Sequence, residues 1–189
     1  MVIYSNNSYL KEHIAKRYDK IKVENASIRI ELHFYDEPIL CISTFKRILY
    51  NKSDLVLVYC SLKNILFLCN LKLPSNIILE RISAPVSEID AKIIKLCQFN
   101  VFNEKFLGRG KVGYSLQLKK KGITKRERLI LFLFITGFSV NEITNVITSS
   151  YKTVSTHKKN IKHKLGISSD VDLLNNRAII ALALREGLI

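Results

Sequence analysis

Short polar residues alternate with lysines between residues 150 and 165, and these are the side chains with the clearest chemical use. Ser155, Thr156 and Lys159 fall on one side of an expected helix. Short polar side chains can hydrogen-bond to base edges in the major groove of DNA, and long cationic ones can reach phosphates. The opposite side carries an apolar stripe that should face a core: Val154, Ile161 and Leu165. The pattern favours groove binding, although a solvated basic helix on an ordinary bundle has the same periodicity.

Residues suited to catalysis or metal binding show no comparable clustering. The four histidines are scattered at positions 13, 33, 157 and 163, so no nucleophile and base are spaced for covalent catalysis. The four cysteines, at positions 41, 60, 69 and 97, lie in apolar surroundings without a C-x-x-C pair. This favours reduced core thiols over zinc ligands or disulfides. We therefore expect a protein that is not an enzyme and that needs no metal or cofactor.

Helix start and stop signals follow one another from residue 123 onward. Two pairs fit the capping box, in which a hydroxyl and a glutamate satisfy backbone N–H groups: Thr124 with Glu127, and Ser139 with Glu142. Two serines can cap further helices that end near residues 165 and 186: Ser150 and Ser169. Glycines at 137, 166 and 187 stand where left-handed C-terminal caps are expected. Because only residues 148–150 separate the second helix from the third, we expect a helix-turn-helix.

One set of residues extends over the last 67 positions without a gap and is far more specific than a short motif. It consists of Ile123, Thr124, Lys125, Arg126 and Glu127; Gly137, Phe138 and Ser139; Glu142 and Ile143; Ser150; Lys152, Thr153 and Val154; His157; Asn160 and Ile161; Lys164, Leu165 and Gly166; and Glu186, Gly187, Leu188 and Ile189. This pattern resembles the LuxR/FixJ (GerE) DNA-binding domain. The resemblance implies an all-α four-helix helix-turn-helix domain that binds double-stranded DNA.

Carried over by position, the resemblance also implies roles for individual residues. Three of them point at base edges: Ser155, Thr156 and Lys159. Four more hold phosphates along the DNA backbone: Lys152, Lys158, Asn160 and Lys164. Two contact the DNA backbone from the start of the preceding helix: Ser139 and Asn141. For His157, packing or a phosphate contact is favoured over catalysis or metal binding.

Two apolar faces of this domain exceed what one core needs. Leu129 and Phe132, at i and i+3 on the first helix, stand where the family more often has charged residues. We expect that face to dock on the N-terminal domain or on a partner. A single fourth helix over residues 170–186 carries one stripe for the core: Val171, Leu174, Ala178 and Leu182. The second stripe, Ile180 with Leu184, is expected to form a dimer that reads a near-palindromic site, with contact to the N-terminal domain as the alternative.

The first half of the chain alternates strands and helices, which predicts an α/β domain. Strands are expected at residues 2–4, 27–35, 55–59 and 77–80, and helices at 9–18, 41–50 and 87–98. Beside a LuxR-type domain, this half resembles a shortened, receiver-like response-regulator domain.

The residues that carry receiver chemistry are replaced in this half. The resemblance places a phosphoacceptor at the end of the strand 55–59, where Tyr59 stands. Ser5, Asn6 and Asn7 replace an acidic pair, and Ala84 precedes Pro85 where a lysine is usual. Without clustered carboxylates we expect no magnesium site and no phosphorylation by a histidine kinase. An acyl-homoserine-lactone sensor is disfavoured by the absence of tryptophan and by the domain's short length, so an interaction or dimerisation domain is favoured.

Charge and composition agree with a C-terminal domain that binds a polyanion. The 189 residues carry a net charge of +14, and residues 119–189 alone hold 13 Lys+Arg against 5 Asp+Glu. Three of the seven glycines lie between residues 108 and 113, which predicts a linker at 104–122 between domains at 1–103 and 123–189. The first residues lack the features of a secretory signal, and the longest apolar run, residues 129–135, is too short to span a membrane.

Together these patterns predict a bacterial transcription regulator that binds DNA independently of phosphorylation. It is expected to be cytoplasmic and nucleoid-associated, without a membrane partner. It is expected to act as a homodimer or as a heterodimer with another regulator, and in the second form it resembles the RcsA-like coregulators. The alternative is a protein-binding coregulator or anti-activator that sequesters another regulator by heterodimerising with it.

Overall fold

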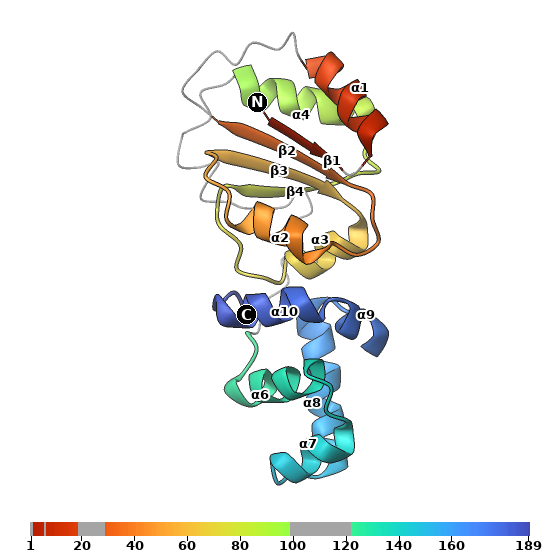
Figure 1. The fold of residues 1–189 in the computed structure, drawn as a ribbon, viewed down its shortest axis with the longest axis vertical. Coiled ribbons are helices and arrows are strands. Elements are labelled where there is room, and N and C mark those ends of the chain that lie inside the picture. Colours follow the sequence, from red (N-terminus) through yellow and green to blue (C-terminus); the bar gives the residue numbers. More distant parts are fainter. Residues whose placement is uncertain (1, 6, 19–28, 99–121) are drawn as a thin grey trace. The chain divides into compact units, whose positions relative to one another are not determined.

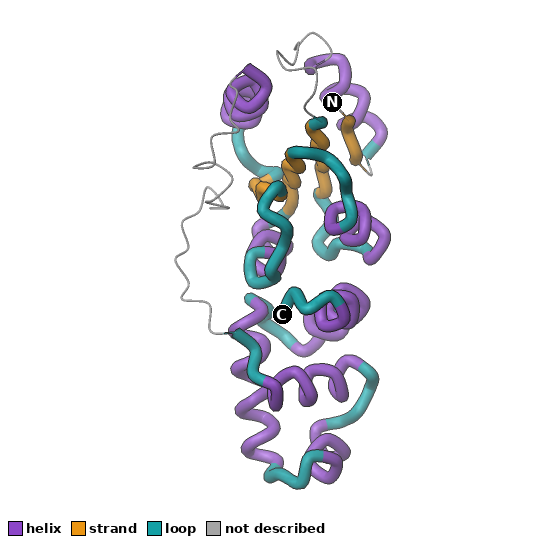
Figure 2. The backbone as a smooth tube through the Cα atoms, turned by 90° about the vertical axis from the view of Figure 1, so that its left-hand side faces the viewer, coloured by secondary structure: helices purple, strands orange, loops and turns teal. Residues whose placement is uncertain are grey.

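The computed structural model describes residues 2–5, 7–18, 29–98 and 122–189. The chain divides into two compact units, residues 1–65 with 73–116 and residues 66–72 with 117–189. A parallel sheet with helices forms the first unit, and the second consists of the helices α6 to α10 together with residues 66–72 (Figures 1 and 2). The expected fold classes, α/β followed by all-α, are therefore confirmed. Except for Gly122, the expected linker at 104–122 lies outside the described residues, so the domain boundaries stay a prediction.

Four parallel strands in the order β1-β2-β3-β4 form the sheet. Their bounds are Val2–Ser5 (β1), Ile30–Tyr35 (β2), Leu55–Cys60 (β3) and Ile77–Arg81 (β4). Strand β3 is paired on both sides, with Leu57 between Leu32 and Ile78. Residues 56–60 of this strand are at most 1% exposed. Such burial explains the continuous apolar run, since a central parallel strand is covered on both faces.

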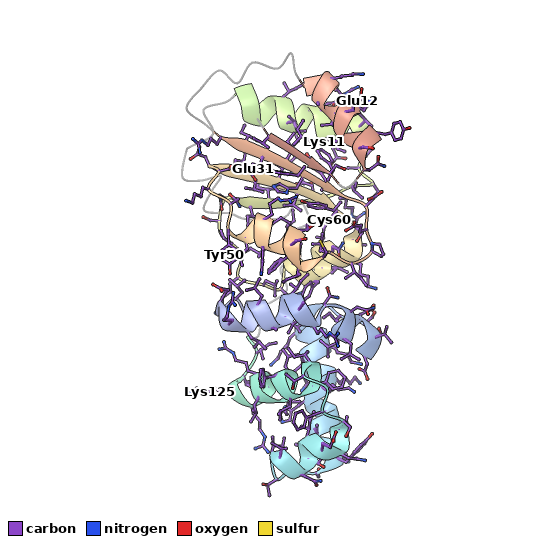
Figure 3. All side chains as sticks on the ribbon, in the orientation of Figure 1. Lys11, Glu12, Glu31, Tyr50, Cys60 and Lys125 are labelled. Atoms are coloured by element: carbon purple, nitrogen blue, oxygen red, sulfur yellow. The ribbon has the colours of Figure 1, made fainter. Side chains whose placement is uncertain are left out.

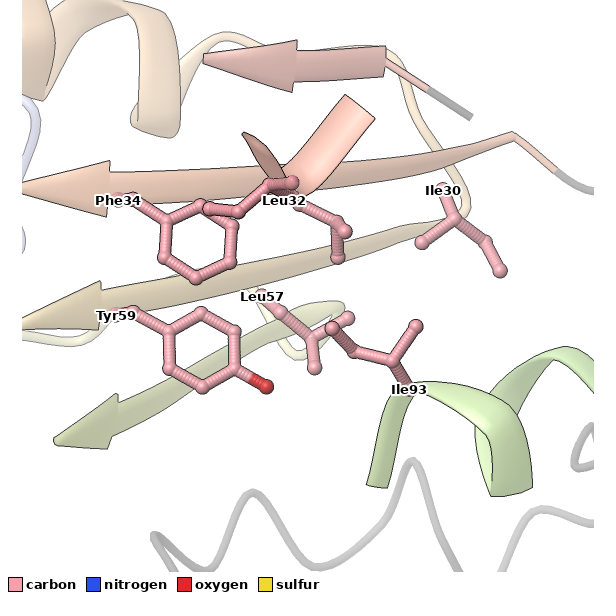
Figure 4. Packing of buried hydrophobic residues seen from close by; sticks show 7 residues of the cluster. Ile30, Leu32, Phe34, Leu57, Tyr59 and Ile93 are labelled. Atoms are coloured by element: carbon pink, nitrogen blue, oxygen red, sulfur yellow. The ribbon is translucent and has the colours of Figure 1, made fainter. Parts of the chain in front are cut away.

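Helices cover both faces of this sheet. They are α1 (Ser8–Tyr18), α2 (Ile42–Leu49), α3 (Leu62–Leu68) and α4 (Val86–Gln98). Figure 1 shows α1 and α4 on one face and α2 and α3 on the other. On the first face, Ile14 of α1 and Ile93 of α4 pack against apolar side chains of the two central strands: Ile30, Leu32, Phe34, Leu57 and Tyr59 (Figure 4). The main core of the unit lies there.

The order of the four described strands matches that of a doubly wound sheet without its second strand. The flavodoxin-like order, 2-1-3-4-5, becomes four parallel strands in sequence order when its second strand is removed. Right-handed crossovers in that larger sheet put the first and last helices on one face and the others on the opposite face. This is the arrangement of α1 and α4 against α2 and α3 (Figure 1). Over the residues that the structure describes, the unit is therefore receiver-like and has one strand fewer than that order.

Tyr59 is not at the end of its strand, because β3 continues through Cys60. Its ring is 1% exposed and stacks on Phe34, with 4.7 Å between ring centroids and 4° between planes. The expectation that Tyr59 occupies the phosphoacceptor position is wrong, since an acceptor must be reachable from solvent. Asp36 and Glu37 follow β2, so this strand end is the one that carries carboxylates.

The opposite face of the sheet holds a buried polar network around His33, which is 0% exposed. The Nδ1 atom of His33 lies 2.9 Å from the hydroxyl of Tyr35, and its Nε2 lies 3.0 Å from Oε2 of Glu31 (labelled in Figure 3). Glu31 also accepts a 2.7 Å hydrogen bond from the hydroxyl of Ser53, and the ring of Tyr4 stacks on His33. Burial lowers the pKa of His33, although the hydrogen bond and charge of Glu31 act in the opposite direction.

Helix α3 has no counterpart among the elements expected from the sequence. Its apolar run, residues 65–69, is short enough to suit either a strand or a helix. Ser61 marks its start, because its hydroxyl accepts from the N–H of Asn64 at 3.3 Å and its carbonyl from that of Ile65 at 3.0 Å. The other elements of this unit lie within three residues of their expected positions.

The helices of the second unit begin and end where the sequence signals place them, up to residue 175. They are α6 (Lys125–Ile135), α7 (Val140–Val146), α8 (Tyr151–Leu165), α9 (Asp170–Asn175) and α10 (Arg177–Arg185). Both expected capping boxes are complete, and Ser150 and Ser169 cap α8 and α9 through the N–H groups of Thr153 and Asp172. The expected left-handed glycines all have positive φ: Gly137, Gly166 and Gly187.

The single helix expected over residues 170–186 is wrong, because the chain breaks at Asn176 into α9 and α10. The buried side chain of Asn176 donates a 2.8 Å hydrogen bond to the carbonyl of Asp172, and so competes with a continuing helix. The break changes which residues face the core. Val171 and Leu174 are 65% and 40% exposed, so the expected core stripe fails except at Leu182, which is buried.

Candidate nucleic-acid interface

A four-residue turn, residues 147–150, joins α7 to α8. Thr148 adopts φ 50°, and the N–H of the next residue, Ser149, donates to the carbonyl of Thr144 at 3.0 Å. This is the hydrogen bond of a left-handed helix end. Ser150 then accepts a 3.1 Å hydrogen bond from the N–H of Thr153 and starts α8. The turn therefore ends one helix and begins the next, as a helix-turn-helix requires.

The inner side of α8 is the expected apolar stripe. Val154, Ile161 and Leu165 are at most 1% exposed, and the helix packs against α6 and α7. Burial of three large side chains fixes the rotation of α8 about its axis. The side chains on its other faces therefore have a defined direction.

The outer side of α8 carries most of the residues expected to meet DNA. Lys152, Thr156, Lys159 and Asn160 are exposed, and Ser155 is half-buried beside them. The hydroxyl of Thr156 donates to the carbonyl of Lys152 at 2.9 Å, so its oxygen remains able to accept. These side chains offer cations, an amide and hydroxyls along one exposed surface, which is the chemistry that phosphates and base edges need.

Lys158 is placed differently, because it binds within the domain. Its Nζ lies 2.7 Å from Oδ2 of Asp170 and 4.4 Å from the ring centroid of Phe134. Lys162 approaches the other oxygen of Asp170 at 2.8 Å. Partial burial raises the pKa of Asp170, but the two lysines hold it below its ordinary value. The trio ties α9 to α8, and the phosphate role of Lys158 stays a prediction.

Lys164 is also paired inside the domain. Its Nζ lies 2.6 Å from Oε2 of Glu127 and 3.2 Å from the carbonyl of Gly122. The side chain of Glu127 is 4% exposed and that of Lys164 is 17% exposed. Burial raises the pKa of Glu127, but hydrogen bonds from Lys164 and Thr124 outweigh burial. The pKa of Glu127 is therefore below its ordinary value. A phosphate contact by Lys164 likewise stays a prediction.

The two residues expected to contact DNA from α7 differ in availability. Ser139 is engaged as a cap: its hydroxyl accepts from the N–H of Glu142 at 3.3 Å, and its own N–H donates to the Glu142 carboxylate at 2.7 Å. Asn141 is exposed. Their contacts with the DNA backbone stay a prediction.

The expected dimerisation residues are not equally accessible. Ile180 is 0% exposed and Leu184 is half-buried. His157 is half-buried, and its Nδ1 atom is buried without a hydrogen-bond partner. This position suits packing rather than chemistry.

Tyr151, the first residue of α8, was not singled out from the sequence. It is 61% exposed, and it precedes Ser155 by four residues, so the two lie on the same side of the helix. The signal was the same helical spacing that selected Ser155 and Lys159.

Metal and membrane sites are not found in the described residues. No group of three or more His, Cys, Asp or Glu side chains in the described ranges is placed to hold a metal ion. Over the same ranges, no helix has the length and apolar character that crossing a membrane requires.

Comparison with known proteins assigns the C-terminal domain. Residues 121–175 match the bacterial regulatory proteins of the luxR family. The chain is 40% identical over 76 residues to the cyclic di-GMP phosphodiesterase PdeL of Escherichia coli K12, which is 40% of this chain and 19% of that protein. It is 38% identical over 63 residues to the transcriptional regulatory protein RcsB of the same strain, or 33% and 29% of the two chains. The match thus spans less than a third of the length of these curated relatives.

Solved structures resemble the chain over most of its length. A structure of two RcsB dimers bound to two parallel DNAs matches with a TM-score of 0.61 and 20% identity, over 92% of this chain and 95% of that one. RcsB of Salmonella enterica serovar Typhimurium bound to the promoter P1flhDC matches with a TM-score of 0.62 and 19% identity, over 94% and 97%. At such identity the likeness is one of fold: a receiver-like domain followed by a luxR-family helix-turn-helix.

Proposed function

We propose that this chain, whose residues 121–175 form a luxR-family helix-turn-helix domain, is a transcription regulator that binds duplex DNA through α8. One observation carries the proposal. The helix buries Val154, Ile161 and Leu165, and this fixes an outer surface on which Lys152, Thr156 and Lys159 are exposed. A buried inner stripe and an exposed cationic and polar outer one are what a recognition helix needs to enter the major groove.

The residues on the outer side of α8 are proposed to have two roles. Ser155, Thr156 and Lys159 read base edges, and Lys152 and Asn160 bind phosphates, with Ser139 and Asn141 at the DNA backbone. For Lys158 and Lys164 a weaker phosphate contact is proposed, because their ammonium groups are paired with the carboxylates of Asp170 and Glu127.

Selection of bound sequences from a random duplex library tests this function. The wild-type chain is expected to enrich a near-palindromic site, and Thr156→Ala and Lys159→Ala are expected to lose that preference. Lys46→Ala is the matched control, because it removes an exposed lysine from α2, outside the interface. Failure of the wild-type chain to enrich any sequence would contradict the proposal.

We further propose that the chain acts as a homodimer or pairs with another regulator, with Leu184 at the contact, since Ile180 is 0% exposed within its own domain. A two-fold dimer places two copies of α8 on the same duplex and accounts for a palindromic site. The RcsB structure with two dimers on DNA supports this reading through its shared fold. Mass measurement in solution with Leu184→Glu tests it, since a monomeric variant is expected.

Regulation is proposed to be independent of phosphorylation. Asp36 follows β2, but Ser5 ends the neighbouring strand β1 and Asn7 follows it, where carboxylates would be needed to bind a magnesium ion. Incubation with acetyl phosphate is expected to leave the chain unmodified. Labelling that disappears in Asp36→Ala would contradict this part of the proposal and leave DNA binding intact.

No catalytic activity is proposed. The match to PdeL covers 19% of that phosphodiesterase, so its activity is not carried over. With a DNA-binding role, we propose that the chain acts in the cytoplasm at the nucleoid.

A second function is favoured by one surface. Leu129 and Phe132 of α6 are 47% and 52% exposed, and Lys125, at the start of the same helix, is exposed as well (Figure 3). Exposed large apolar side chains beside each other suit a protein contact. The chain would then act as a coregulator or anti-activator by heterodimerising with another regulator.

A further inference from the structure

The first residue of α8 is an aromatic side chain directed to solvent. Tyr151 follows the cap Ser150 and is 61% exposed, although α8 buries its apolar side chains elsewhere. Among the described residues, no hydrogen bond or ring contact of the Tyr151 side chain is found. A tyrosine that is mostly exposed at the first position of a helix is little restricted by internal packing, so its ring is available for a ligand.

Its place on the helix aligns it with the residues proposed to read bases. Tyr151, Ser155 and Lys159 are spaced by four residues and form one line along α8. Thr148 and Ser150, which lie in the turn before α8, are exposed as well. In a helix-turn-helix the N-terminal residues of the recognition helix approach base edges most closely. Tyr151, as the first residue of this line, is therefore expected to lie close to the base edges.

We propose that Tyr151 is a specificity-determining residue that contacts the C5-methyl group of a thymine in the major groove. This inference rests on the proposed DNA-binding function. Thymine is the base that presents an apolar group in that groove, and an aromatic ring is a suitable surface for it. Ser155, next along the line, ends in a hydroxyl and hydrogen-bonds instead.

The test combines a change in the protein with a change in the DNA. The probe is the site selected by the wild-type chain, in one form with thymine and in another with deoxyuridine, which lacks only the methyl group. Wild-type affinity is expected to fall about fourfold for each contacted methyl lost, as burial of one methyl group predicts. Tyr151→Ala is expected to bind both probes equally, whereas Tyr151→Phe keeps the preference for thymine. Tyr9→Ala, which removes another exposed tyrosine from α1, is the matched control and should behave as wild type.

The outcomes distinguish failure of the thymine contact by Tyr151 from failure of the proposed DNA-binding function. A wild-type chain that selects a site but binds the two probes equally overturns the role of Tyr151 and leaves DNA binding in place. The same holds if Tyr151→Ala still discriminates between the probes. Selection of no site at all overturns the proposed function itself.

Discussion

Lys164 near the end of α8 and Glu127 in the first turn of α6 form a shielded ion pair, with 2.6 Å between Nζ and Oε2. Glu127 also closes the capping box of α6, because its Oε2 accepts from the N–H of Thr124 at 2.8 Å. One carboxylate therefore caps one helix and holds another. The ion pair therefore holds α8, which carries the candidate interface, against α6.

Loss of the cation from this pair should destabilise the domain more than loss of the carboxylate charge. Lys164→Met leaves a 4% exposed carboxylate unpaired and is expected to cost about 3 kcal/mol in the free energy of unfolding. Glu127→Gln keeps the cap and leaves a lysine that can turn to solvent, so about 1 kcal/mol is expected. Urea denaturation measures both, with the exposed Lys159→Met as control. Equal losses at the two positions would show that the pair does not behave as a buried one.

Thr148 is in the left-handed conformation, at φ 50°, which a β-branched residue adopts at a cost. Thr148→Gly is expected to raise the free energy of unfolding by about 0.5–1 kcal/mol. Thr136→Gly is the matched control, because Thr136 caps α6 at φ −85° and has no strain to relieve. A thermal melt decides the matter, and a lower melting temperature for Thr148→Gly would contradict the reading of the turn.

Short-range chemistry made the second unit predictable from sequence up to residue 175. A hydroxyl residue followed three positions later by a glutamate favours the start of a helix through local hydrogen bonds alone. Thr124 and Ser139 form such capping boxes in the structure. The break at Asn176 escaped prediction because asparagine mid-helix is tolerated when its side chain faces water, whereas here it is buried and bonds to the backbone.

Long-range pairing limited the prediction of the site and of the sheet. The exposed surface of α8 followed from its periodicity, but the partners of Lys158 and Lys164 lie 12 and 37 residues away in sequence. Spacing along one helix carries no information about such contacts. Tyr59 was misplaced for a similar reason, since the end of its strand depends on the neighbouring strands.

His33 should make the first unit less stable in acid. Burial lowers its pKa below 6.5, so below that pH the unfolded chain binds a proton that the folded chain excludes. The free energy of unfolding is therefore expected to fall as the pH drops below 6.5 toward the lowered value. Denaturation at pH 7.5 and 5.5 measures the difference, which should shrink in His33→Phe and persist in the control, His13→Gln, since His13 is exposed. If the free energy of unfolding of His33→Phe fell by as much between pH 7.5 and 5.5 as that of the wild type, a group other than His33 would cause the acid sensitivity.

The apolar pair on α6 separates the two candidate functions. Leu129→Lys combined with Phe132→Glu changes only exposed positions and should alter stability by no more than about 0.5 kcal/mol. If the face binds another regulator, the double variant is expected to lose heterodimerisation in a pull-down with that regulator while its DNA affinity stays unchanged. Wild-type dimerisation, DNA binding and interdomain protection in the variant would rule out a role for this face.

Salt dependence should distinguish free lysines from paired ones. Each phosphate neutralised contributes about 0.9 to the slope of log affinity against log salt, so Lys152→Ala should reduce that slope by about 2 in a dimer. Lys158→Ala is expected to change it by less than half as much, because the ammonium group of Lys158 is held by Asp170 and lies over the ring of Phe134. Titration of the selected site between 50 and 200 mM salt gives both slopes. Equal reductions would mean that Lys158 leaves Asp170 when DNA binds, and then the pairing within the domain would not predict which lysines meet phosphate.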